Sequence, residues 1–520
     1  MNYKLIKKLR VAVSLIFLLS IIVLFLDLSF SLPENFAGYP VYLQFVPSLL
    51  KFISIGTVAA AGFFIVLLLT VLFGRIYCST ICPLGILQDV ITYIRKQFKK
   101  LRYSYSKPFT KTRYSVLAAA VILLLSGSVI GLLLLDPYSN FGRIILNIIR
   151  PATIGLNNAV AFTSEHFNQY WFYPVEWKGV EPFAVLFSFS FLAVVIWLSI
   201  KYGRLYCNTV CPVGTLLGFI SKYSIFRLTI EEENCKGCSA CEKVCKSSCI
   251  DTKNKYIDFS RCVDCFNCFT VCPTSGIKFK FAYSSKKEKT QTADEDKRDF
   301  LKKTAVYFIG TSIIAKAQEK IEVYKESTKP VLRKYAVSPP GSSSLENFTD
   351  NCTACHLCVA ACPTQVLQPS FLEYGLLGIM QPRMDYKKGF CNYDCTICGS
   401  VCPSGAILEQ KIETKKLIQL GKAQFEKENC IVYSQGTDCG ACAEHCPTKA
   451  VHMELDPEVN RKSPHINEET CIGCGACEYA CPTFPYKSIW VKSNPEHLAA
   501  KKPEEEKLEQ NVDLKEEFPF

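Results

Sequence analysis

Cysteines recur at fixed short intervals from residue 235 onward, and they constrain the fold of this 520-residue chain more than any other feature. Six groups follow, or nearly follow, the spacing Cys-x2-Cys-x2-Cys-x3-Cys. Three thiolates so close together hold one 4Fe-4S cluster, and the fourth reaches the cluster of a sister group. Zinc sites seldom need this arrangement, and disulfide frameworks belong to short secreted chains. The spacing therefore favours iron–sulfur clusters.

The first two groups have the spacing of a bacterial two-cluster ferredoxin. Lys246 rather than proline follows the last cysteine of the first group, and the spare Cys249 either replaces Cys245 as a ligand or is a free thiol. One predicted cluster is held by Cys235, Cys238, Cys241 and Cys272, and the other by Cys262, Cys265, Cys268 and Cys245.

Four further groups follow residue 350, and the second and third of them have irregular spacing. Their sixteen cysteines divide into four cluster sites, which brings the expected number of clusters to six. Neighbouring groups could pair, or the pairs could be nested, first with fourth and second with third. The central position of the two irregular groups favours nesting. The four groups are Cys352, Cys355, Cys358 and Cys362; Cys391, Cys395, Cys398 and Cys402; Cys430, Cys439, Cys442 and Cys446; and Cys471, Cys474, Cys477 and Cys481.

Histidines argue against haem. The segment Cys352-Thr-Ala-Cys355-His356 matches the Cys-x-x-Cys-His attachment motif of c-type haem, but both thiols already belong to a cluster group. We therefore expect His356 to be a surface residue beside the cluster. None of the six histidines lies in a long apolar run, which disfavours a b-type cytochrome.

Apolar residues make up 49% of the chain and are concentrated in blocks before residue 228. A helix needs about 20 apolar residues to cross the hydrocarbon of a membrane. The stretch 142–162 is interrupted by Arg150-Pro151 and by Asn157-Asn158, so it predicts an interfacial or re-entrant piece rather than a span. We predict four transmembrane helices from the runs Val11–Phe30, Phe52–Phe73, Ser115–Leu135 and Phe183–Ile200.

Basic residues predict the orientation of these helices. Four of them precede the first apolar run, and nine lie between residues 75 and 113, whereas the other loops have few. Because positive residues stay on the cytoplasmic side, both ends of the unit should face the cytoplasm. The opposite loop is aromatic between Tyr170 and Trp177, as expected at lipid headgroups.

An internal repeat ends the second and fourth runs. Gly74-Arg-Ile-Tyr-Cys-Ser-Thr-Ile-Cys-Pro-Leu-Gly85 matches Gly203-Arg-Leu-Tyr-Cys-Asn-Thr-Val-Cys-Pro-Val-Gly214. Pseudo-symmetry would bring four thiols together at the cytoplasmic face, where they suit an iron–sulfur cluster, zinc or Cu(I). The alternative is a structural or dithiol-exchange role. These thiols belong to Cys78, Cys82, Cys207 and Cys211.

The segment from Lys297-Arg298 to Lys303 resembles a twin-arginine export signal whose first arginine is lysine, although an amphipathic surface helix is the alternative. Export would place residues 346–495 in the periplasm.

We expect a multi-domain α+β fold, a four-helix transmembrane domain followed by bacterial-ferredoxin-like modules. The predicted parts are a membrane domain (1–228), a two-cluster domain (229–282), a linker (283–345), a four-cluster domain (346–495) and a charged disordered tail (496–520).

These motifs resemble a known family. Residues 1–280, with the paired Gly-Arg-x-Tyr-Cys-x3-Cys-Pro motifs, resemble the NapH/NosR/MauN group of membrane polyferredoxins. Residues 297–490, with the Lys-Arg-x-Phe-Leu segment and Pro339-Pro340-Gly341 before Phe348, resemble NapG/MauM, an exported ferredoxin with four clusters. The resemblance implies a fused quinol dehydrogenase of the bacterial inner membrane that passes electrons to a periplasmic reductase. It also assigns the cysteines of the repeat a role at the membrane face.

The chain is therefore expected to be an electron-transfer protein. Catalytic nucleophile motifs, phosphate loops and Rossmann glycines are absent from the sequence. Expected partners are the membrane quinone pool and a periplasmic reductase or another redox protein, with no nucleic acid. Six oxidised clusters at about −2 each would offset the formal charge of +12. Alternatives are a membrane redox factor for metalloenzyme assembly and a relay that faces the cytoplasm.

Overall fold

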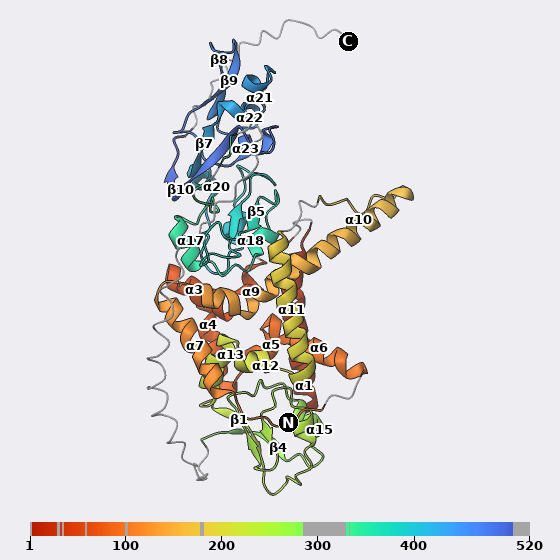
Figure 1. Ribbon diagram of the computed structural model, residues 1–520. Helices are drawn as coiled ribbons and strands as arrows, with labels where there is room; N and C mark the ends of the chain where they lie inside the picture. The colour runs from red at the N-terminus through yellow and green to blue at the C-terminus, as the bar shows by residue number, and fades with distance from the viewer. Residues whose placement is uncertain are drawn as a thin grey trace, which may run out of the picture.

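A bundle of helices lies between two cysteine-rich units in the computed structural model (Figure 1). The smaller unit lies beside the N-terminus, and the larger one lies at the other end of the bundle. The structure describes residues 3–28, 32–33, 36–57, 60–98, 102–176, 181–283, 329–331 and 333–502.

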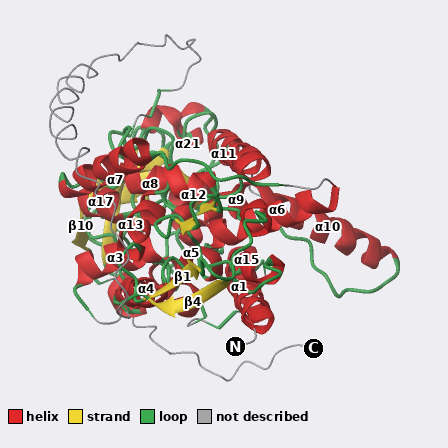
Figure 2. Ribbon diagram, turned by 90° about the horizontal axis from the view of Figure 1, so that it is seen from below, coloured by secondary structure: helices red, strands yellow, loops and turns green. Residues whose placement is uncertain are grey.

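Three helices in this part of the chain are long and apolar enough to cross a membrane. They are α1 (Tyr3–Leu26), α11 (Pro182–Tyr202) and a composite helix that runs from Pro137 to His166. The composite helix consists of α9 (Pro137–Ile144), the π-helical turn η2 (Ile145–Ile149) and α10 (Arg150–His166). Figure 2 shows α10 reaching away from the other helices.

Two of the four predicted spans are not single helices. The run 52–73 is divided between α3 (Phe45–Ile55) and α4 (Gly62–Phe73), because Gly56 ends α3 in the left-handed conformation with φ of 69°. The run 115–135 is divided between α7 (Thr110–Leu125) and α8 (Ile130–Leu135), and Gly127 between them has φ of 85°. In both cases a glycine permits a backbone turn that few other residues adopt.

The predicted break at Arg150-Pro151 is wrong, because the helix continues through it. Proline removes one backbone donor and crowds the carbonyl four residues earlier. That earlier residue, Asn147, lies within η2, where the wider π-helical turn accommodates the proline ring.

Each sequence repeat forms a short helix followed by a longer one that begins at a proline. The first repeat consists of α5 (Tyr77–Thr80) and α6 (Pro83–Phe98), and the second of α12 (Leu205–Thr209) and α13 (Pro212–Ser221). Proline is favourable in the first helical turn, since no intrahelical donor is lost there. The cysteine before each proline therefore lies at a helix start. A further short helix, α2 (Gly38–Tyr42), precedes α3.

The smaller unit is closed by its first and last strands. β1 (Phe226–Ile230) pairs antiparallel with β4 (Ile277–Phe281), so the predicted boundary at 228/229 falls inside a strand. The other elements of this unit are α14 (Ala240–Lys243), β2 (Ile250–Asp251), β3 (Tyr256–Ile257) and α15 (Asn267–Val271).

The larger unit extends beyond the predicted 346–495. β7 (Ile418–Phe425) pairs with β10 (Ile489–Ala499), so the predicted tail begins within a strand. Arg333 donates to the carbonyl of Val491, which attaches part of the predicted linker to the unit. The export-like segment 297–303 and residues 503–520 lie outside the described residues. The remaining elements are α17 (Leu345–Asn351), α18 (Leu357–Ala360), β5 (Leu367–Pro369), β6 (Pro382–Met384), α19 (Ile397–Ser400), α20 (Ile412–Lys415), η4 (Lys427–Asn429), α21 (Ile431–Ser434), α22 (Ala441–Glu444), β8 (Val451–Asp456), β9 (Arg461–Ile466) and α23 (Ala476–Ala480).

Glycine at the start of α6 and α13 permits close contact within each repeat. A Cβ added at Gly85 would lie 2.2 Å from the carbonyl oxygen of Cys78, and one at Gly214 would lie 2.2 Å from that of Cys207. We expect Gly85→Ala and Gly214→Ala each to destabilise the detergent-solubilised protein by about 1–3 kcal/mol, since backbone must move. Thermal unfolding measures this. Gly155→Ala in α10, where a Cβ meets nothing within 4 Å, is the control, and equal losses in all three variants would contradict the prediction.

Candidate metal centres

The four thiols of the sequence repeat meet inside the helical bundle. All four thiols are buried, and the thiol of Cys82 is close enough to the other three to interact with them electrostatically. The four residues are Cys78, Cys82, Cys207 and Cys211. Figure 1 shows α5 and α12, which carry Cys78 and Cys207, between α9 and β1, so the site lies part-way along the bundle. Four convergent soft ligands can hold an iron–sulfur cluster or a thiophilic metal ion.

Two arginines connect the repeats reciprocally. Nη2 of Arg75 donates to the carbonyl of Cys207 at 3.0 Å, and Nη1 of Arg204 donates to the carbonyl of Cys78 at 2.5 Å. Both guanidinium groups are fully buried. Each arginine occupies the same place in its Gly-Arg-x-Tyr-Cys motif, so the bonds follow the pseudo-symmetry of the repeat.

Asp89 neutralises charge on one side of this site. Its carboxylate lies 2.8 Å from Arg204, 3.1 Å from Lys246 and 3.5 Å from Arg10. Burial by itself would raise the pKa of Asp89, but Arg204, Lys246 and Arg10 outweigh burial and hold that pKa well below its usual range. The carboxylate thus joins α1, both repeats and the smaller unit. Asp89 was not among the residues predicted for this site; the arginine that both motifs share is the sequence signal for a buried acidic partner.

The smaller unit contains two sets of thiols. Cys241 lies in electrostatic range of Cys235 and Cys272. A second set lines a cavity that includes Cys249 as well as the expected ligands. The Sγ atoms of Cys245 and Cys249 are 3.5 Å apart, so both thiols can reach the same centre. The expected ligands in that cavity are Cys245, Cys262, Cys265 and Cys268.

In the larger unit, neighbouring groups pair, and the nested arrangement favoured by the sequence is wrong. The thiols of the first group lie near Cys402 of the second, while those of the second lie near Cys362 of the first. Likewise Cys430, Cys439 and Cys442 lie near Cys481, and the fourth group lies near Cys446. β7 precedes the third group and β10 follows the fourth, so the pairing of these strands brings the two groups together. The irregular cysteine spacing gives no indication of this strand pairing.

The surroundings of these thiols suit a cationic centre. Burial raises the pKa of Cys355 and of Cys474 to about 12 each. A thiolate at such a position needs compensating positive charge, which coordinated iron supplies. The donor set of four sulfur atoms is the one that binds 4Fe-4S clusters.

Contacts link consecutive thiol sets. The side chain of Tyr138 in α9 lies in electrostatic range of Cys355 and Cys402, and Arg143 donates to the carbonyls of Thr353 and Ala354. These contacts seat the first site of the larger unit on the bundle.

Within the larger unit, the backbone N–H of Cys391 donates to the carbonyl of Cys474 at 2.9 Å. This bond places the second site against the site of Cys471, Cys474, Cys477 and Cys446.

His356 is buried rather than on the surface, contrary to expectation. Its backbone adopts φ of 65° immediately before α18, and its Nε2 lies 2.7 Å from the carbonyl oxygen of Met380. His356 lies between the predicted ligands Cys355 and Cys358, and the backbone turn at this position directs its ring into the protein interior.

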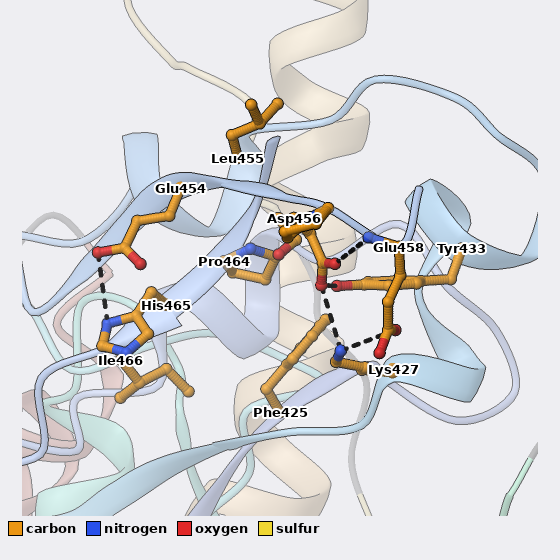
Figure 3. A pocket seen from close by; sticks show the side chains of 12 residues that line it. Phe425, Lys427, Tyr433, Glu454, Leu455, Asp456, Glu458, Pro464, His465 and Ile466 are labelled. Carbon is orange, nitrogen blue, oxygen red and sulfur yellow. Dashed lines mark hydrogen bonds and ion pairs between the residues drawn. The ribbon is translucent and has the colours of Figure 1, made fainter. Parts of the chain in front are cut away.

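A polar cavity of about 630 Å3 lies at the outer edge of the larger unit (Figure 3). Lys427 bridges Asp456 and Glu458 on one side, while His465 and Glu454 lie on the other. Pro464 lines both this cavity and the site of Cys430, Cys439, Cys442 and Cys481, so the cavity adjoins the outermost thiol set.

Comparisons with known proteins agree with these thiol sets. A family described as a 4Fe-4S binding domain matches residues 55–102 and 183–230, which contain the two repeats. Two families of 4Fe-4S dicluster domains match residues 258–366 and 429–484. No solved structure matches the chain. The fold and the sites define a ferredoxin-type protein with several 4Fe-4S clusters.

Curated relatives identify the family. The ferredoxin-type protein NapG of Escherichia coli is 34% identical over 152 residues, which are 28% of this chain and 64% of NapG. The methylamine utilization ferredoxin-type protein MauM of Methylorubrum extorquens is 31% identical over 169 residues, 31% of this chain and 74% of MauM. An uncharacterized protein of Methanocaldococcus jannaschii is 35% identical over 112 residues, 21% of this chain and 45% of that protein. The chain belongs to the NapG/MauM family of ferredoxin-type proteins.

Neighbour pairing makes a prediction about iron content. Cys355→Ala and Cys402→Ala should each remove the same centre, about four iron atoms, because a cluster with three ligands is open to hydrolysis. The double variant should lose no more iron than either single variant. Cys355→Ala combined with Cys395→Ala should lose about twice as much. Iron analysis of anaerobically purified protein measures these losses, and additive losses for Cys355 with Cys402 would contradict the pairing.

Proposed function

We propose that this protein is a membrane-bound polyferredoxin that carries electrons from membrane quinol, through a series of 4Fe-4S clusters, to a periplasmic reductase. The observation that carries the proposal is the series of thiol sets. Sets of cysteines occur in the smaller unit, in the bundle and in the larger unit, and Figure 1 shows these three parts one after another. Quinol releases two electrons, whereas each cluster takes one, so a series of clusters suits this donor.

The series is supported by one contact at each step. Cys265 of the smaller unit lies in electrostatic range of Lys246 and Asp89, which adjoin the bundle site. On the other side of that site, the hydroxyl of Tyr206 donates to the carbonyl of Leu135, the last residue of α8, two residues before α9 begins. Tyr138 of α9 then lies beside Cys355. Within each two-site module, the exchange of fourth ligands keeps the paired centres close.

The proposed topology places the two units on opposite sides of the membrane. The basic start of α1 lies beside the smaller unit, where Lys7 is in electrostatic range of Cys265 and Cys268. By the positive-inside rule this side is cytoplasmic, and the larger unit at the other end is periplasmic. An export signal at 297–303 would deliver the larger unit there. The short apolar helices α3, α4, α7 and α8 would complete the bundle between the long helices.

The proposal predicts that quinol reduces the purified protein. Adding a short-chain menaquinol under argon should bleach the visible cluster absorbance, and dithionite should set the full amplitude. Cys355→Ala should retain absorbance from its other clusters but bleach less with quinol, because the series is interrupted beside α9. Dithionite bleaching without any quinol bleaching would refute quinol as the donor and favour a role in metalloenzyme assembly.

The topology predicts opposite accessibility for two exposed positions. Ser343 lies in the larger unit and Lys253 in the smaller one. In intact spheroplasts, a membrane-impermeant maleimide should label Ser343→Cys, and it should label Lys253→Cys only after permeabilisation. Mass spectrometry of the two peptides separates these thiols from the native ones. Protection of both positions in intact cells would place both units in the cytoplasm.

A further inference from the structure

A cavity of about 110 Å3 lies where the larger unit meets the helical bundle. The bundle contributes α2, the start of α3 and Ala60, and the larger unit contributes the segment 400–403. That segment contains Cys402, the fourth thiol of the site that includes Cys352, Cys355 and Cys358. The cavity therefore adjoins a cluster-ligand set directly.

We propose that this cavity binds the ring of a membrane quinone. The inference rests on the proposed function and assigns it a donor site. A cavity of roughly 150 Å3 accommodates a benzene ring, so a volume of 110 Å3 is on the scale of one ring at the open end of a pocket. The cavities lined by the other ligand sets measure only about 10–20 Å3, too little for a ring, and the cavity at the outer edge of the larger unit lies away from the bundle.

The lining offers one cation to a quinone oxygen. Lys51 of α3 lines the cavity, and its side chain forms no hydrogen bond or ion pair with other described residues. Ser48 is engaged, because its hydroxyl donates to the carbonyl of Ala60 at 2.8 Å and accepts from the N–H of Phe63 at 2.9 Å. Gly405 lies next to α3, where a Cβ would make ordinary contacts at 3.5 Å with the side chains of Lys51 and Ile55. The ammonium group of Lys51 would therefore donate a hydrogen bond to an oxygen of the quinone ring.

The surroundings also provide a path for the apolar tail of a quinone. Ile53 and Ile55 on α3 are 60% and 39% exposed, and Tyr39 on α2 is 76% exposed. These residues flank Lys51 and the cavity on the side of the bundle. A molecule with a polar ring and an isoprenoid tail matches this combination of a cationic cavity and an exposed apolar surface.

Photoaffinity labelling of the full-length protein in lipid nanodiscs tests the site. An azido-ubiquinone with a short tail should crosslink to peptides that contain residues 37–60 or 400–405. Lys51→Gln should weaken its binding at least tenfold, whereas Lys51→Arg should bind within about threefold of wild type. Lys201→Gln, at the end of α11 beside the smaller unit, is the matched control and should bind like wild type. Val41→Phe, which fills the cavity from α2, should abolish the crosslink.

Iron content and the spectrum after dithionite reduction show that each variant retains its clusters. If quinol bleaches the protein but crosslinks map elsewhere, or if Lys51→Gln binds normally, the site is overturned and the proposed function stands. If the quinone neither binds nor reduces the protein, the proposed function fails as well. Crosslinks from a photoactivatable phospholipid in place of the quinone would make the cavity a lipid site and would overturn the proposal.

Discussion

The reciprocal hydrogen bonds that two buried arginines form between the sequence repeats are the interaction on which the rest of the structure depends. Arg75 and Arg204 each bind the carbonyl of the first cysteine of the opposite motif, so each repeat completes the other. Glycine in the following turn leaves room for this approach, because the Cβ of any other residue would meet the same carbonyl and guanidinium. The four thiols converge because the two halves are held in this way.

Such a site is stable only as a complete set of charges. Moving an unpaired guanidinium out of water costs several kcal/mol, and removing one partner of a buried pair costs about 3–5 kcal/mol. Asp89 provides the compensating charge for Arg204, and it also binds Arg10 of α1 and Lys246 of the smaller unit. The same carboxylate therefore fixes the start of α1 and the position of the smaller unit against the bundle. This interaction unites segments more than 150 residues apart in the sequence.

Local features of the fold could be predicted from the sequence, whereas features that depend on distant contacts could not. Three cysteines within seven residues define one loop around a cluster, so the triads followed from spacing alone. The pairing of the third group with the fourth depends on the pairing of β7 with β10, which no local pattern encodes. Hydropathy located apolar runs but not the turns at Gly56 and Gly127, because a glycine within an apolar run hardly changes its mean hydropathy. The sequence indicated a break at Pro151, and the π-helical turn before it absorbed the proline.

Burial differs along the series of thiol sets and restricts which partners can exchange electrons with each. Cys238 at one end is exposed, and Cys439 and Cys442 at the other end are partly so. By contrast, all four thiols of the bundle site and all four of the adjacent set with Cys402 are buried. A soluble protein can approach the end sets, but protein side chains separate it from the buried ones. The cavity beside α3 adjoins the set with Cys402, so a small molecule bound at the proposed site would lie next to that set. The division of burial thus supports the proposed function, in which a lipid-soluble donor would deliver electrons within the length of the protein and a macromolecular partner would accept them at its end.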